Sequence, residues 1–213
     1  MRLRTQVWWS IVHSGACAAM LMAAACGGSE STQTQTATQA PVEAPAKAIE
    51  KPFVAEGKID MQLGAGSYIV RPASGNAIRV TMSGNVGGAK ADVTTKETQA
   101  NVAVTDTPGN NFHAIVEVPQ AADLVIRLGA GELTVEAIKG SKDVENNAGN
   151  VDIVTGDSQD YASVDATVQA GDLKAGPFGE SQSGLFRNFT WSGKGKYSLR
   201  AKLIAGNLTL RSN

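Results

Sequence analysis

The stretch LGAGELTVE (128–136) has four near-copies elsewhere in this chain of 213 residues. The copies are GAGSYIVRP (64–72), NAGNVDIVT (147–155), QAGDLKAGP (169–177) and IAGNLTLRS (204–212). Alignment on the glycine that follows the alanine defines five corner glycines, namely Gly66, Gly131, Gly149, Gly171 and Gly206. Such a repeat predicts one structural unit used five times, and its residue pattern indicates which unit.

Apolar and polar residues alternate on both sides of each corner glycine. After Gly131 the apolar residues are Leu133 and Val135, and the residues upstream alternate in the same way. The third copy alone departs, with Lys142 and Asn146 at positions that are apolar in the other copies. A period of two is typical of a strand with one buried face. The unit is therefore strand, x-Ala-Gly, strand.

The Ala-Gly pair supplies the corner between the two strands. Glycine reaches positive φ at low cost, and a residue without a side chain lets neighbouring corners approach closely. We expect valine at a corner to strain the backbone, and serine or asparagine to be tolerated better. The middle copies are spaced by 18 and 22 residues, which suits one coil of a solenoid.

Further alternating runs lie between the first two copies, at 78–82, 102–104 and 112–118, and turn-forming residues separate them. No amphipathic helix is evident after residue 53. The fold class predicted is all-β, as a single β-solenoid domain over residues 53–213, of the right-handed parallel β-helix type. A β-sandwich of short strands is the alternative.

The stretches VEVPQAADLVIRLGAGELTVEAIKG (116–140), NAGNVDIVT, QAGDLKAGPFG and GLFRNFTWSGKGKYSLRAKLIAGNLTLRS (184–212) carry a resemblance. They are similar to the bacterial putative-adhesin domain of unknown function, in which V-x-V-P strands and A-G-[DNE]-[LV] corners stack into a β-solenoid. The resemblance covers residues 110–213 well and 53–109 loosely. It implies a fold and an adhesin-like role, and it brings no catalytic residues.

The N-terminus has the layout of an export signal. Arg2 and Arg4 precede a mostly apolar run at 7–25, so residues 1–25 are expected to be a cleaved signal peptide, with an uncleaved anchor as the alternative. Ala-Ala-Cys-Gly at 24–27 resembles the lipobox of bacterial lipoproteins, although Ala23 stands where leucine is usual. The resemblance implies lipidation of Cys26; ordinary cleavage is the alternative. Gly27 in place of aspartate suggests the outer membrane or cell surface.

Residues 26–52 are rich in Ser, Thr, Gln, Ala and Pro, so they are expected to form a lipid anchor site and a disordered linker. Both cysteines, Cys17 and Cys26, precede the domain, which excludes a disulfide or thiolate site within it. Without Arg2 and Arg4, 17 basic and 20 acidic residues leave a formal charge of −3. With no basic tract, nucleic acid is not an expected partner.

Motifs for catalysis or cofactors are missing from the sequence. His113 is the one histidine outside the signal, which is too few for a zinc site. Ser192 lacks the glycines of a nucleophile elbow, and Asp157, Asp160 and Asp165 lack a calcium-binding pattern. We therefore expect no enzyme activity, no metal and no cofactor.

The function expected is that of an exported, lipid-anchored binding module of the cell envelope, whose repetitive surface holds a polymer, an envelope protein or a host surface. A structural or sensory scaffold is the alternative. A carbohydrate-active enzyme, built from paired carboxylates on adjacent coils, is the third.

Four aromatic residues gather near the last copy: Phe178, Phe186, Phe189 and Trp191. One interpretation is an apolar cap over the unpaired edge that a solenoid leaves at its end. The other is an exposed binding patch, because aromatic anchors dominate interfaces. The sequence leaves both open.

Overall fold

The computed structural model describes residues 47–212, which form thirteen strands in one sheet, two short 3-10 turns and no α-helix. The all-β prediction is confirmed. The predicted signal peptide, Cys26 and most of the predicted linker lie outside the described residues. No helix within the described part is long and apolar enough to cross a membrane.

The strands are β1 (Lys47–Pro52), β2 (Gly57–Leu63), β3 (Gly66–Pro72), β4 (Ala77–Gly84), β5 (Lys90–Lys96), β6 (Gln99–Thr105), β7 (Phe112–Val118), β8 (Ala122–Leu128), β9 (Gly131–Val135), β10 (Lys142–Val154), β11 (Tyr161–Ala175), β12 (Glu180–Ser192) and β13 (Tyr197–Arg211). The 3-10 turns are η1 (Ser158–Asp160) and η2 (Gly176–Phe178).

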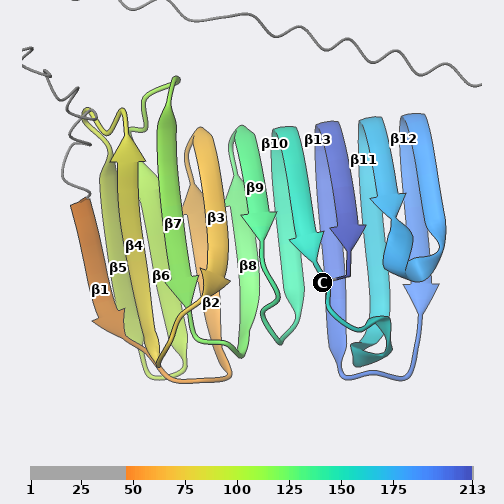
Figure 1. The fold of residues 1–213 in the computed structure, drawn as a ribbon, viewed down its shortest axis with the longest axis horizontal. Helices are drawn as coiled ribbons and strands as arrows, with labels where there is room; N and C mark the ends of the chain where they lie inside the picture. The colour runs from red at the N-terminus through yellow and green to blue at the C-terminus, as the bar shows by residue number, and fades with distance from the viewer. Residues whose placement is uncertain (1–46, 213) are drawn as a thin grey trace, which may run out of the picture. The chain divides into compact units, whose positions relative to one another are not determined.

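The sheet folds back on itself into two layers, which makes it a nearly closed, barrel-like structure (Figure 1). The long strands β10 to β13 bend at their corners and contribute to both layers (Figure 1). Pairing is parallel through the middle of the sheet. It is antiparallel toward the ends, where β1 pairs with β4, β4 with β7, β5 with β6, and β11 with β12.

The core lies between the two layers and follows the alternation of the sequence. In β2, Ile59, Met61 and Leu63 are buried, and the residues between them face outward. The inward side chains of both layers form one continuous apolar cluster. Its burial is the main favourable term in folding.

The corner glycines lie in one row across the parallel strands, in the order Gly66, Gly131, Gly149, Gly206 and Gly171. Their φ angles run from 118° to 151°, a region that L-residues rarely adopt. A Cβ on Gly149 would collide with the carbonyl oxygen of Gly131, and a Cβ on Gly131 with that of Gly66. The first atom of any side chain, serine and asparagine included, therefore meets backbone at these corners.

The spatial order of the copies differs from their order in the chain. β13, which carries the fifth copy, pairs with β10 on one side and β11 on the other. The 22-residue step from Gly149 to Gly171 thus passes over one position in the sheet, which β13 later fills. β12 makes this possible because it runs back antiparallel along the far side of β11.

The predicted linker ends earlier than residue 52. Strand β1 occupies Lys47–Pro52 and pairs with β4 from Lys47↔Met82 to Pro52↔Ala77. Only Ile49 among its side chains is partly buried, so the strand lacks an apolar alternation. Backbone pairing and the ion pair between Glu50 and Arg79, at 2.8 Å, hold it in place.

We predict that Gly149→Ala lowers the free energy of unfolding by about 3 kcal/mol or more, because it adds a backbone collision to an unfavourable φ. Gly75→Ala is the matched control: a Cβ there meets nothing within 4 Å, and the change should stay below about 0.5 kcal/mol. Urea unfolding measures both. Equal stability of the two variants would contradict the close-approach argument.

Candidate functional site

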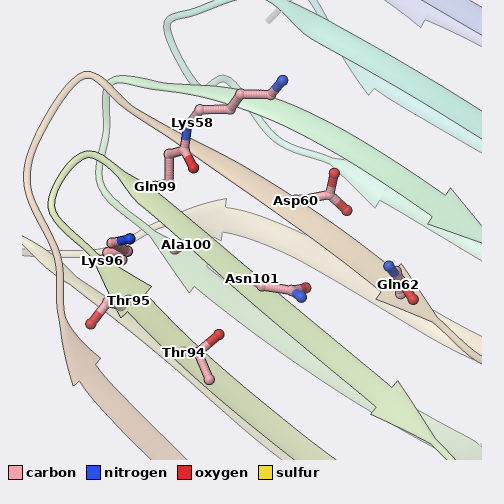
Figure 2. Close-up of a pocket in the computed structure, with 9 residues that line it drawn as sticks. All are labelled: Lys58, Asp60, Gln62, Thr94, Thr95, Lys96, Gln99, Ala100 and Asn101. Carbon is pink, nitrogen blue, oxygen red and sulfur yellow. The ribbon is translucent and has the colours of Figure 1, made fainter.

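An open groove of about 590 Å³ lies on the outer face of β5, β6 and β2 (Figure 2). Strand alternation sets which side chains line it. Because Ile59 and Met61 point into the core, Lys58, Asp60 and Gln62 point out of β2 into the groove. The neighbouring strands contribute Thr94, Thr95, Lys96, Gln99, Ala100 and Asn101.

The outward side chains form rows that cross three strands. Lys58 pairs in register with Gln99, which pairs with Lys96. The next row runs from Asp60 through Asn101 to Thr94, and Figure 2 shows Asn101 between the other two. Adjacent strands lie about 4.8 Å apart, and successive rows about 7 Å apart along the strands. The groove is therefore a regular lattice of polar groups.

These groove side chains are not engaged with one another: among the hydrogen bonds and ion pairs of residues 47–212, none joins them. Some outward side chains elsewhere pair across strands. Arg71 contacts Glu117 at 3.0 Å, and Asn207 Nδ2 donates to Asn150 Oδ1 at 2.9 Å. The groove thus presents amide, hydroxyl, ammonium and carboxylate groups that are free to bind a ligand.

A second polar feature lies inside the fold, at Lys142. Its side chain is 2% exposed, and its Nζ donates to the carbonyl oxygen of Ile138 at 2.7 Å and to that of Gly140 at 3.2 Å. It also lies 3.1 Å from the hydroxyl of Tyr161, which donates to the carbonyl oxygen of Thr155 at 3.2 Å. The ammonium therefore ties together the segments on either side of β10.

Burial lowers the pKa of Lys142 to about 8, and the carboxylates of Asp123 and Asp160 oppose this shift. Burial also raises the pKa of Tyr161 above its ordinary value. Asn146, the other polar departure in the third copy, is buried too. Its Oδ1 accepts from the backbone N–H of Ala148 at 3.3 Å, and its Nδ2 has no partner among the described residues.

Three of the four aromatic residues noted in the sequence lie together. The ring of Phe178 is 5.0 Å from that of Trp191 and 6.2 Å from that of Phe189, and all three pack against the core. Phe186 is 79% exposed, beside Leu185 at 64%. The structure thus divides the cluster into an inward group and an outward residue.

His113 and Asp157, considered from the sequence as metal ligands, do not line the groove. His113 is exposed, with Nε2 3.1 Å from Asn111 Oδ1. Asp157 caps η1 by accepting from the N–H of Gln159 at 2.9 Å. Within the described part of the chain, no three His, Cys, Asp or Glu side chains gather as metal ligands.

Sequence reasoning missed the groove. Its residues occupy mainly the polar positions of β2, β5 and β6, and alternation by itself places such positions only on the solvent side of a strand. The available signal was the pairing of the run at 99–105 with that at 57–63, because this register makes the outward amides neighbours. The buried Lys142 had a clearer signal, as a departure from the repeat.

Neither a protein-family model nor a curated protein matches the sequence. Among solved structures, a putative cell adhesion protein from Clostridium sporogenes aligns with a TM-score of 0.50 and 14% identity, over 79% of this chain and all of that one (100%). A putative adhesin from Bacteroides fragilis aligns with a TM-score of 0.29 and 10% identity, over 78% of this chain and 97% of that one. A putative adhesin from Parabacteroides merdae aligns with a TM-score of 0.27 and 11% identity, over 79% of this chain and 92% of that one. The first likeness supports the fold.

We predict that the stability of the protein rises with pH between 7 and 9.5, by about 2 kcal/mol through Lys142. The pKa of Lys142 is lowered from 10.5 to about 8 in the folded state. In this window the unfolded chain therefore binds more protons than the folded one, and raising the pH favours folding. The measurement stays below pH 10. Above that pH the tyrosines of the unfolded chain ionise, whereas burial keeps Tyr68 and Tyr161 protonated in the folded state, so the protein loses stability.

Lys142→Met removes the titrating group and should flatten this part of the pH profile. Urea unfolding of both proteins at several pH values measures the difference in slope. Parallel profiles would contradict a buried, titrating ammonium.

Proposed function

We propose that this protein is a non-enzymatic, adhesin-like binding module that holds an extended, hydroxyl-rich polymer, such as a polysaccharide, in the groove of β5, β6 and β2. The observation that carries the proposal is the pair of in-register polar rows whose side chains are not bonded to each other. At several other places on the described surface, comparable side chains satisfy one another across strands.

An open groove with a repeated spacing suits a repeated ligand. Amide groups such as those of Gln99 and Asn101 both donate and accept, which matches sugar hydroxyls. Lys58 and Lys96 at one end favour carboxylate groups on the polymer, while Asp60 limits the net positive charge of the groove. Each contact is weak, and affinity accumulates along the chain of the ligand.

The carboxylate content of the groove supports binding without hydrolysis. Asp60 is the one acidic side chain that lines it. Glycoside hydrolysis by the usual routes requires two carboxyl groups that flank the scissile bond. A polymer held there would remain intact.

We further infer that the domain is a β-solenoid of the right-handed parallel type. The in-register parallel pairing of β9, β10, β13 and β11, with corner glycines stacked backbone on backbone, supports it. Right-handed crossovers are the rule for parallel strands. A β-sandwich shares the two layers, but it does not require long strands that continue through a common corner.

The proposed location is the cell envelope, on the outer membrane or cell surface, through a lipid on Cys26. The residues between Cys26 and β1 would act as a flexible tether with a reach of roughly 25 Å. Adhesion is named for the Clostridium sporogenes protein with a similar fold. A surface position would bring the groove into contact with envelope or host polysaccharide.

To test the groove, we predict that Gln99→Ala combined with Asn101→Ala lowers affinity for cell-wall polysaccharide by roughly tenfold or more, from two lost hydrogen bonds of about 1 kcal/mol each. Asn150→Ala, an exposed amide on the other layer, is the matched control and should bind like the wild type. Glycan arrays and pull-down on insoluble wall polymer provide the measurements. The proposal fails if the wild type binds no polysaccharide, or if both variants bind equally well.

To test the anchor, we predict that Cys26→Ser moves the protein from the membrane fraction to the soluble fraction. The variant lacks the thiol that the acyl chain requires, and the export signal is unchanged. Fractionation with detection of the domain measures the shift. A variant that stays membrane-bound would contradict the lipid anchor.

A further inference from the structure

β12 forms the end of the sheet in both layers (Figure 1). It pairs antiparallel with β11 from Ser163↔Ser192 to Ala175↔Glu180. Among the described strands, none pairs with its other side. Along this strand of thirteen residues, alternate residues therefore direct free backbone donors and acceptors to one edge, and such an edge is a template for another strand.

The opposite end of the sheet is protected. There the end strands are β1 and β5, and they carry Lys47, Lys51, Pro52, Lys90 and Lys96. Lysine and proline on an edge strand prevent further pairing. β12 contains no lysine and no proline, so the two ends differ in their capacity to accept a strand.

The corner of β12 is also unusually apolar for an exposed site. Leu185 is 64% exposed and Phe186 79%, and Ile204 at the corner of β13, on the far side of β11, is 44% exposed. Phe186 has a φ of 54°, which is uncommon for a bulky residue. A strained, exposed phenylalanine beside an exposed leucine indicates a contact surface.

We propose that β12 pairs antiparallel with β12 of a second copy, related by a twofold axis through this corner. One half of β12 ascends in one layer, and the other half descends in the other layer (Figure 1). In a copy rotated by 180° about an axis along the strands, the descending half of β12 lies beside the ascending half of the first copy. Its ascending half lies beside the descending half of the first copy. A partner must bend at the same height to pair with both halves, and a second copy does so by symmetry.

The pairing of β11 with β12 locates the corner of β12. Ala170 pairs with Leu185 and Val168 with Arg187, so Leu185 and Phe186 lie at this corner. A twofold axis placed between Leu185 and Phe186 sets Leu185 of one copy against Phe186 of the other. Outward, Ser183 then faces Asn188 and Ser181 faces Thr190, so no like charges oppose. Inward, Phe189 then faces Gln182 and Trp191 faces Glu180, so the aromatic group of each copy lies at the junction of the two cores.

This dimer places the polymer grooves at its two outer ends, because β5, β6 and β2 lie away from β12 in the sheet. Two grooves on one dimer bind a long polymer with an avidity that a single groove lacks. The dimer itself does not depend on the polymer proposal, and its tests involve no ligand.

Sedimentation equilibrium of the mature chain with Cys26→Ser, which removes the lipid, tests the dimer. We expect a mass twice that of the chain at micromolar concentration. Leu185→Lys with Phe186→Asn should raise the dissociation constant at least 100-fold. Asparagine suits the positive φ at this position, so the variant should remain folded and should still show a cooperative thermal unfolding transition. Val54→Lys is the control: Val54 is an exposed apolar residue of the β1–β2 connection, and its variant should remain a dimer. A wild type that is monomeric at all concentrations overturns the proposal.

Cysteine cross-linking tests the register. The mature Cys26→Ser chain contains no cysteine, so Ser183→Cys and Asn188→Cys each introduce a single thiol. Mixing the two variants should give a disulfide-linked dimer under mild oxidation, and each variant alone should give much less. A dimer that resists the Leu185→Lys, Phe186→Asn change and forms no mixed cross-link would place the interface elsewhere and overturn the proposal.

Discussion

The contact on which the rest of the structure depends is the approach of backbone to backbone at the corner glycines. At Gly131, Gly149 and Gly171, the space that a side chain would need is filled by the carbonyl group of a neighbouring corner glycine. Neighbouring strands therefore turn at the same height. A shared corner aligns every inward residue with an inward residue and every outward residue with an outward one, so the apolar core and the polar surface rows follow from one steric condition.

The surface rows then differ in how their side chains are used. At several places on the outer face, opposite charges or amides are paired on adjacent strands, as in the contact of Arg211 with Asp152 at 2.8 Å. Exposed pairs of this kind contribute little to stability, but they do occupy the polar groups that a ligand would need. On β5, β6 and β2 the same register brings together polar side chains that do not bond to one another. These side chains are therefore available to a ligand because of which residues occupy the outward positions.

The sequence predicted the all-β fold and the corner glycines because both depend on local patterns, namely alternation and a small residue at a turn. It did not predict that β13 lies between β10 and β11. The corners of β10, β11 and β13 all carry the Ala-Gly pair. Nothing in the local sequence therefore shows whether the 22 residues from Gly149 to Gly171 lead to the next strand in the sheet or to the strand after it. β1 was missed because its single partly buried side chain, Ile49, makes no pattern. The groove was missed because it depends on which strands are neighbours.

The buried Lys142 lies beside the connection that skips this position. The chain leaves β10 at Val154 and begins β11 two positions away in the sheet, so the connecting segment cannot continue the ladder of backbone hydrogen bonds. Buried carbonyl groups without partners are costly. Lys142 satisfies those of Ile138 and Gly140 in the segment before β10, and the Tyr161 hydroxyl that it contacts donates to that of Thr155 in the connecting segment. The hydrogen bonds that Lys142 makes thus offset part of the cost of burying its ammonium group, whereas an apolar residue in keeping with the repeat would leave the carbonyl groups of Ile138 and Gly140 without this donor.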